Sequence, residues 1–283
     1  MRCDLENATI DYEELGEGRP IVFLHGWTMD RRLEMADYEP IFAKRNGWRR
    51  LYFDLPGMGR SVAKTGLRTQ DDVLAAVLAF IEARLPGQRF VLAGTSLGAY
   101  LARAVAVRLR PRVDGLLLRV PCIVADTAHR NLPPFEPIVR DDDLLEMLDA
   151  AERAALGDVL VQTPGYLEAL RKKIHGFVAP AMAAAAPLAA EMRADPARYG
   201  FSFDLRALEK NFIAPALIVA ARQDTTVGYR DAWDVLESYP HATFAVIDRA
   251  DHAWPVESPR LLEALVDDWP GSCLPRAGDR RCS

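Results

Sequence analysis

Cysteine is scarce in this sequence: the 283 residues include only Cys3, Cys122, Cys273 and Cys282. Their number and spacing fit neither a disulfide framework nor a zinc site, so we expect reduced thiols. An excess of basic residues is also lacking, since the formal net charge is −5. The charge argues against a protein that binds nucleic acid or an anionic membrane surface.

Long apolar runs are lacking too. No stretch approaches the length of a membrane span, and residues 1–16 contain no apolar segment typical of a secretory signal. The chain is 50% hydrophobic and 27% charged, as is usual for a soluble globular protein. We therefore expect a cytoplasmic protein of enzyme size with a small-molecule substrate and no membrane partner. A homodimer is left open.

Apolar strands alternate with helical patterns through most of the chain. Two short strands are expected within residues 1–15, and further strands at 21–24, 50–53, 90–93, 113–120, 216–221 and 243–247. Helices are expected at 36–44, 70–85, 99–107, 230–236 and 258–269. This alternation predicts an α/β fold with a mostly parallel central sheet and helices on both faces.

The alternation is interrupted between residues 121 and 206, where the sequence is Ala-rich, helical and broken by prolines. An insertion placed over the carboxyl ends of the strands would form a lid. We therefore expect a core made of residues 1–120 and 207–270 and a helical cap at 121–206. The polar tail at 271–283 is expected to be poorly ordered.

The segment Gly94-Thr95-Ser96-Leu97-Gly98 joins an apolar strand directly to a helix. So short a connection forces its central residue into a strained backbone, while glycines allow neighbouring chain to pass closely. The pattern G-x-S-x-G in this context indicates a nucleophile elbow with Ser96 at its apex. The alternative is a small residue that fills a tight turn.

A serine nucleophile needs a base and a group that orients the base. His252 follows the last predicted strand, so it lies at the same sheet edge as Ser96. Asp224 follows the strand at 216–221 and is the expected acid, with an Asx turn or a helix cap as its alternative role. Asp126 is the second candidate for the acid. The remaining histidines lie at positions 25, 129, 175 and 241.

The chain resembles the α/β-hydrolase superfamily over most of its length. The resemblance is carried by His25-Gly26-Trp27, Asp54-Leu55-Pro56-Gly57-Met58-Gly59-Arg60-Ser61, Gly94-Thr95-Ser96-Leu97-Gly98, Ala221-Arg222-Gln223-Asp224 and Asp251-His252. It implies a catalytic triad of Ser96, Asp224 and His252. It also implies an oxyanion hole formed by the backbone N–H groups of Trp27 and Leu97. Asp251 departs from the family pattern, which usually has glycine before the catalytic histidine.

These observations predict a serine hydrolase that acts on a small or medium apolar ester, thioester or amide and needs no metal or cofactor. An apolar substrate pocket is expected to involve His25, Trp27, Phe177, Met182 and Trp254, although ordinary core packing is the alternative for each. Other reactions with the same triad are C–C bond hydrolysis, a lyase reaction and acyl transfer. A ligand-binding protein with little turnover is a further alternative.

Overall fold

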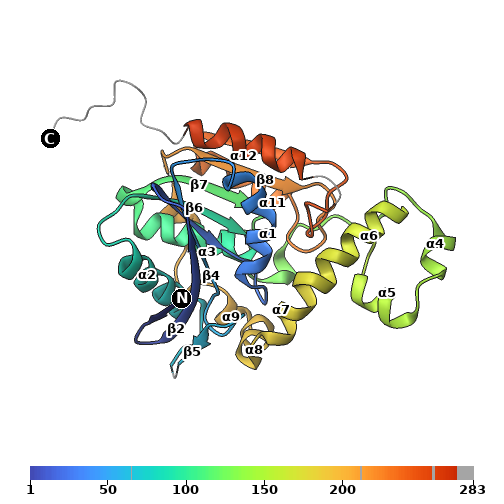
Figure 1. Ribbon diagram of the computed structural model, residues 1–283, viewed down its shortest axis with the longest axis horizontal. Coiled ribbons are helices and arrows are strands. Elements are labelled where there is room, and N and C mark those ends of the chain that lie inside the picture. Colours follow the sequence, from blue (N-terminus) through green and yellow to red (C-terminus); the bar gives the residue numbers. More distant parts are fainter. Residues whose placement is uncertain (65, 211, 257–258, 273–283) are drawn as a thin grey trace.

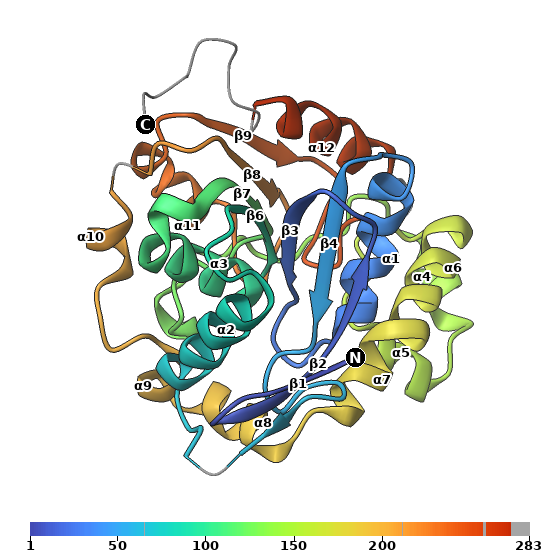
Figure 2. The same ribbon diagram turned by 60° about the vertical axis from the view of Figure 1, so that its left-hand side comes forward.

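The computed structural model describes residues 1–64, 66–210, 212–256 and 259–272. Within these residues a central sheet of nine strands has the order β1-β2-β4-β3-β6-β7-β8-β9, with β5 paired to β2 (Figure 2). The strands are β1 (Arg2–Asp4), β2 (Ala8–Leu15), β3 (Arg19–Leu24), β4 (Trp48–Phe53), β5 (Val62–Ala63), β6 (Phe90–Thr95), β7 (Val113–Arg119), β8 (Ala216–Ala221) and β9 (Ala242–Ile247). β4, β3, β6, β7, β8 and β9 pair in parallel.

Helices cover both faces of the sheet, as the sequence predicts. The core helices are α1 (Arg31–Phe42), α2 (Gln70–Arg84), α3 (Leu97–Arg108), α10 (Leu205–Glu209), α11 (Arg230–Trp233) and α12 (Arg260–Ser272). Figure 2 shows α1 and α12 on one side of the sheet and α2, α3 and α11 on the other. The parallel strands are therefore buried on both faces, which explains their uninterrupted apolar sequences.

Successive residues of one strand belong to different apolar cores. In β3, Val22 and Leu24 pack in the core beneath α2 and α3, whereas Ile21 and Phe23 pack in the core beneath α1 and α12. All four are fully buried or nearly so. This alternation follows from the two-residue period of a strand, and it fixes which way each strand faces.

The insertion forms a helical cap with many short elements. They are η2 (Thr127–His129), α4 (Asp142–Glu146), α5 (Ala150–Leu156), α6 (Pro164–Lys173), η3 (Ile174–Val178, a π-helical turn), α7 (Ala179–Ala184), α8 (Pro187–Ala194) and α9 (Pro196–Tyr199). A proline stands in the first turn of each of α6, α7, α8 and α9. Because proline fits a first turn, the prolines of α6, α8 and α9 favour helix starts at those positions. Helix α7 instead continues directly from η3, so its proline lies within a longer helical run.

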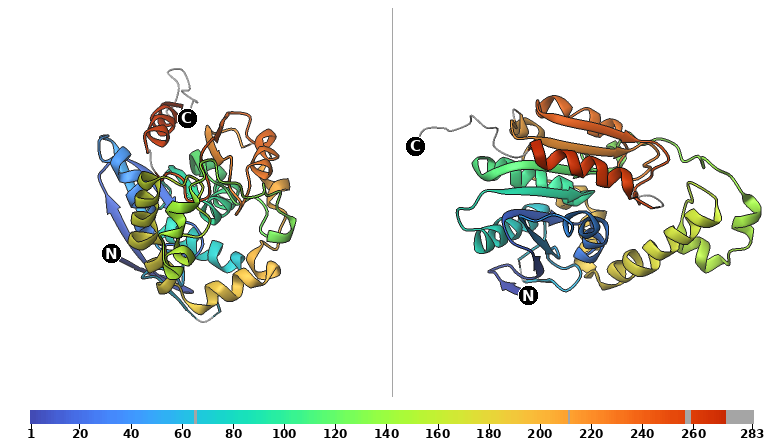
Figure 3. Two further views of the ribbon diagram at one scale, coloured as in Figure 1. Left: turned by 90° about the vertical axis from the view of Figure 1, so that its right-hand side faces the viewer. Right: turned by 45° about the horizontal axis from the view of Figure 1, so that its top comes forward.

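The cap divides into two parts by packing. Helices α4, α5 and α6, here called the outer lobe, enclose a small apolar cluster that includes Leu156, Leu160 and Leu170. Helices α8 and α9, here called the inner arm, contribute Ala189, Met192 and Tyr199 to the main core. The outer lobe projects away from the sheet in Figures 1 and 3.

Several predicted boundaries differ from the structure. Helix α1 begins at Arg31 and not at residue 36, because the Asp30 side chain accepts a hydrogen bond from the Arg32 backbone N–H and so caps an earlier start. The predicted helix at 230–236 is shorter, since α11 ends at Trp233 and Leu236–Ser238 forms a separate 3-10 turn. Helix α12 runs to Ser272, into the predicted tail; residues 273–283 lie outside the described residues.

The described cysteines, Cys3 and Cys122, are free thiols. Cys273 and Cys282 lie outside the described residues. Among the helices that the structure describes, none combines the length and the apolar character needed to cross a bilayer.

Candidate active site

Ser96 occupies a strained turn between β6 and α3. Its φ of +55° lies in the left-handed region that non-glycine residues seldom adopt. Close backbone packing enforces the turn: a Cβ on Gly98 would lie 2.0 Å from the Leu24 carbonyl oxygen, and one on Gly94 would lie 2.4 Å from the Gly98 carbonyl oxygen. The predicted elbow is therefore present, and the Ser96 side chain makes no capping bond to α3.

The Ser96 hydroxyl meets His252, and His252 meets Asp224. The Ser96 Oγ lies 3.0 Å from His252 Nε2, and His252 Nδ1 lies 2.8 Å from Asp224 Oδ2. Because the carboxylate accepts, Nδ1 is the donor and Nε2 can accept a proton from the hydroxyl. The Asp224 side chain is 1% exposed and that of His252 is 29% exposed, so the acid is shielded from water while the base is accessible.

Asp224 forms the turn considered from the sequence and also contacts His252, while its role as the catalytic acid stays a prediction. Its Oδ1 accepts hydrogen bonds from the backbone N–H groups of Thr226 at 2.8 Å and Val227 at 2.9 Å. Its Oδ2 faces His252. The Asx-type turn immobilises the carboxylate, and the second oxygen is left to orient the imidazole.

The two predicted oxyanion donors lie next to Ser96. Leu97 is the first residue of α3, where the helix leaves N–H groups without an intrahelical acceptor. The loop at Gly26-Trp27 is also close, since a Cβ on Gly26 would lie 3.4 Å from Ser96 Cβ. Within the described part of the chain, the N–H groups of Trp27 and Leu97 make no hydrogen bond. The role of these two N–H groups as an oxyanion hole stays a prediction.

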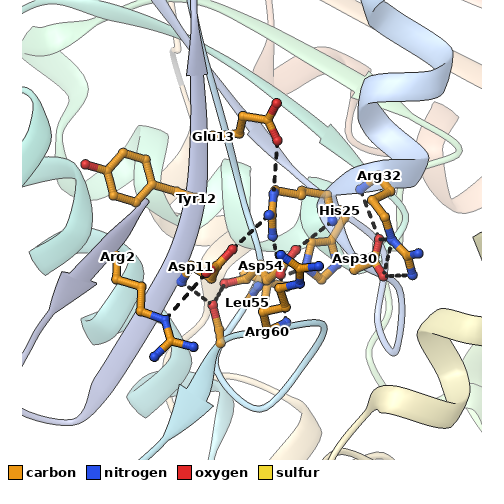
Figure 4. Close-up of polar contacts among 12 residues, drawn as sticks. Arg2, Asp11, Tyr12, Glu13, His25, Asp30, Arg32, Asp54, Leu55 and Arg60 are labelled. Carbon is orange, nitrogen blue, oxygen red and sulfur yellow. Dashed lines mark hydrogen bonds and ion pairs between the residues drawn. The ribbon is translucent and has the colours of Figure 1, made fainter.

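His25 does not line a substrate pocket, which corrects the prediction. Its side chain is fully buried; Nε2 accepts from the Leu55 N–H at 2.8 Å, so Nδ1 donates to the Gly26 carbonyl at 2.7 Å. Burial lowers the pKa of His25, which favours this neutral ring. Figure 4 shows it beside Asp54 and Leu55. His25 therefore fixes the Gly26–Trp27 peptide from within the protein.

The other four predicted pocket residues have different surroundings. The Trp27 indole N–H donates to the Ala189 carbonyl at 2.9 Å, which joins this loop to the inner arm. Trp254 is buried and borders a cavity of about 250 Å³ whose lining includes neither Ser96 nor His252. Phe177 is half-buried and Met182 is 56% exposed. Their contact with a substrate stays a prediction.

The remaining candidates lie away from Ser96. Asp126 contacts His129 Nδ1 at 2.8 Å on the surface, so the second candidate for the acid has a local partner of its own. His175 and His241 are exposed. Position along the sheet edge therefore distinguished His252 from the other histidines correctly as the ring beside Ser96.

A buried ionic cluster that the sequence did not predict lies beneath the elbow. Arg119, the last residue of β7, donates through Nε to the Thr95 hydroxyl at 3.1 Å and through Nη1 to Asp37 Oδ2 at 2.5 Å. Its backbone carbonyl accepts from the Ser96 N–H at 3.0 Å. An arginine that follows three buried leucines at the end of a strand was the available signal, because a buried arginine requires partners.

A mostly parallel sheet with a serine, a histidine and an aspartate in contact at its carboxyl edge has the architecture of the α/β-hydrolase class. The alpha/beta hydrolase family model matches residues 21–265, and the chain belongs to this family of enzymes.

Curated relatives agree with this membership. The chain is 31% identical over 159 residues to the AB hydrolase superfamily protein YisY of Bacillus subtilis, covering 54% of this chain and 57% of that protein. It is 26% identical over 257 residues to the pimeloyl-[acyl-carrier protein] methyl ester esterase of Aliivibrio salmonicida, covering 87% and 90%. In the first three curated relatives, the match spans about half of each relative's length.

Solved structures show the same fold. An alpha/beta superfamily hydrolase from Oenococcus oeni PSU-1 superposes with a TM-score of 0.82 at 24% identity, covering 96% of this chain and 99% of that one. At this level of identity the likeness concerns the fold, and the chemistry has to be argued from the site.

Proposed function

We propose that this chain is a serine hydrolase that cleaves a small or medium apolar ester through an acyl-enzyme on Ser96. The observation that carries the proposal is the pair of contacts at 3.0 Å and 2.8 Å linking Ser96, His252 and Asp224. Both distances lie within the range over which a nucleophile and its base exchange a proton.

The geometry supports a two-step mechanism. Ser96 Oγ attacks the ester carbonyl while His252 Nε2 takes its proton, and Asp224 stabilises the imidazolium. The N–H groups of Trp27 and Leu97 donate to the oxyanion, and α3 adds the positive end of its dipole. His252 then protonates the departing alcohol. Water, deprotonated by the same imidazole, cleaves the acyl-enzyme to a carboxylic acid and frees Ser96.

The ester as substrate class is supported by the relatives. Those from Aliivibrio salmonicida and Shewanella woodyi are named as methyl ester esterases. An apolar acyl group is supported by the inner arm, whose buried residues include Ala189 and Met192 and whose Ala189 carbonyl accepts from the Trp27 indole. We extend the ester linkage, and not the carrier-bound acyl group of those relatives, to this chain.

The test is active-site labelling with a fluorophosphonate, together with turnover of p-nitrophenyl esters of increasing acyl length. Ser96→Ala is expected to abolish labelling and to lower kcat at least about 1,000-fold, because the nucleophile is lost. Medium-chain esters should compete best with the probe. The exposed Ser202, whose hydroxyl donates to Asp71 at 3.1 Å, gives the matched control Ser202→Ala, which should label like the wild type.

Three outcomes would contradict the proposal. A folded wild type that neither labels nor hydrolyses esters would indicate a ligand-binding protein. Cleavage of a vinylogous diketone without ester turnover would indicate a C–C hydrolase. Product diverted to an added alcohol or amine in preference to water would indicate an acyltransferase.

A further inference from the structure

Helix α6 of the outer lobe contacts the loop that carries His252 on both sides of that residue. The Tyr166 hydroxyl donates to Asp251 Oδ2 at 3.2 Å, and Lys173 Nζ donates to the Pro255 carbonyl at 3.0 Å. Tyr166 and Lys173 are seven residues apart, so they share one helix face about 10 Å long. Asp251 and Pro255 flank His252 in the sequence. One face of one helix thus contacts both sides of the proposed base.

Apolar contacts join the same two segments. Ala253 and Val256, which follow His252, pack against the apolar cluster of the outer lobe. On the opposite side, Gln223 of the acid loop accepts from the Ala250 N–H at 3.2 Å and donates from its own backbone N–H to the Ala250 carbonyl at 2.9 Å. The core therefore fixes the beginning of this loop and also buries Trp254 further along it, whereas Ala253 and Val256 contact the cap.

Lys173 is fixed in place by the buried cluster beneath Ser96. Its Nζ lies 3.4 Å from Asp37 Oδ2, and the same oxygen accepts from Arg119. Lys173 and Asp37 are each 11% exposed in their side chains. Burial would raise the pKa of Asp37, but the charges of Lys173 and Arg119 outweigh it and lower that pKa, so the carboxylate remains a partner for both cations.

Asp251 has a structural reason to be an acid at the position where the family usually has glycine. Its Oδ1 accepts from the Ala253 N–H at 2.8 Å and its Oδ2 accepts from Tyr166. Glycine would offer neither oxygen. Burial raises the pKa of this carboxyl group, yet both oxygens have donors. The departure from the family pattern thus coincides with a contact between cap and loop.

We propose that Tyr166, Lys173 and Asp251 are positioning residues through which the seating of α6 sets the place of His252 relative to Ser96. The outer lobe and the proposed triad are then coupled: His252 reaches Ser96 when α6 is seated on its loop. The catalytic part of this inference rests on the proposed function. The structural part, that α6 immobilises residues 251–255, does not.

The structural part is tested by hydrogen–deuterium exchange of the segment 248–256. Tyr166→Phe removes only a hydroxyl group, and Lys173→Met removes only the charged donor. Both variants should speed exchange in this segment about tenfold or more, because the N–H groups of Ala253 and Trp254 bond within the loop that α6 contacts. The control is Lys172→Met: Lys172 is 74% exposed and pairs with Glu168 within α6, so its loss should leave the exchange unchanged.

The catalytic part is tested by the rate at which the fluorophosphonate labels Ser96. Misplacing His252 should lower the labelling rate at saturating probe about 10- to 100-fold, with the apparent binding constant of the probe nearly unchanged. Asp251→Ala should show this loss. Asp251→Asn should restore most of the rate, because the amide can bond both to the Ala253 N–H and to the Tyr166 oxygen.

The possible results separate the two proposals. Wild-type rates of exchange and labelling in both Tyr166→Phe and Lys173→Met would overturn the inference. Faster exchange throughout the protein, with the same fall in Tm in both variants, would also overturn the inference. The contacts would then stabilise the whole fold and not the loop of His252 in particular. A wild type that never labels, with exchange raised only at 248–256 in the variants, would refute the proposed function and leave the positioning by α6 standing.

Discussion

The carboxyl edge of the sheet and the outer lobe of the cap are built by different means. At the edge, Ser96 is held at a positive φ by strands and a helix that approach so closely that only glycine fits at position 98. In the outer lobe, helices of 5, 7 and 10 residues enclose a small cluster, and Met147 is 81% exposed.

Strain can persist only where many neighbours determine a conformation together. The edge meets this condition and the lobe does not. A side chain that needs an accurate position can therefore be held by the carboxyl edge of the sheet alone. The outer lobe can also help to position such a side chain, but only through a few defined polar contacts such as those of Tyr166 and Lys173.

The largest expected effect concerns the acid at the edge. In Asp224→Asn the amide oxygen can keep the bonds to Thr226 and Val227, so its NH₂ group would face His252 Nδ1. That ring would then carry its proton on Nε2 and could not accept one from Ser96. We expect kcat for a p-nitrophenyl ester to fall about 10,000-fold with little change in Tm.

The matched control for this variant is Asp126→Asn, because Asp126 lies on the surface beside His129. It should retain the wild-type kcat. A loss of less than tenfold in Asp224→Asn, with the fold intact, would show that the edge does not fix the histidine in the way described.

A second prediction tests the packing difference between edge and cap. Gly98→Ala would bring its Cβ to 2.0 Å from a backbone oxygen of β3, which no side-chain rotation can relieve. We expect the free energy of unfolding to fall by about 4 kcal/mol, beyond the usual 1–3 kcal/mol of overpacking. Urea denaturation measures it.

The control from the cap is Gly176→Ala in η3, where a Cβ would meet no atom within 4 Å. This change should leave the stability the same or raise it by up to about 1 kcal/mol, because alanine loses less backbone entropy on folding. If both substitutions lowered the free energy of unfolding by the same amount, the contrast between a crowded edge and an open cap would be wrong.

The smallest expected effect concerns Glu34, which lies between the edge and the cap. It accepts from the Thr95 hydroxyl at 3.0 Å and is fully buried, and burial raises its pKa from 4.5 to about 7. The groups around it are Thr95, Asp37, Tyr38, Arg119 and Lys173. Between pH 4.5 and 7 the unfolded chain loses this proton while the folded protein keeps it, so a rise in pH destabilises the fold.

Glu34→Gln removes that dependence. Relative to the wild type, the variant should gain stability as the pH rises from 4.5 to 7, by up to about 3 kcal/mol, and the difference should be constant above pH 7. Urea denaturation at a series of pH values measures it. A difference that does not change with pH would mean that Glu34 is ionised throughout.

Much of the core and of the site followed from the sequence because both depend on local patterns. The period of the strands, the G-x-S-x-G turn and the position of Asp224 and His252 just after strands are all readable without tertiary structure. The early start of α1 was missed because Arg31 and Arg32 begin it without an apolar repeat, although Asp30 was a usable cap signal.

The contacts of α6 could not be predicted, for a physical reason. The seven-residue spacing of Tyr166 and Lys173 shows that they share a helix face, but not what that face meets. Their partners are 85 and 82 residues away along the chain. Likewise, the spacing around His25 indicated a loop at a strand end but not that the ring would be enclosed.

The bond between the Trp27 indole and the Ala189 carbonyl bears on how a ligand gets in. A molecule that enters by lifting the inner arm must break this bond and disturb the peptide that offers the Trp27 N–H. One that enters by lifting α6 must instead break the bonds of Tyr166 and Lys173 to the loop of His252. On either of these routes the segment that moves is bonded to a part of the proposed active site, so we expect these bonds to form again before the proposed nucleophile Ser96 reacts.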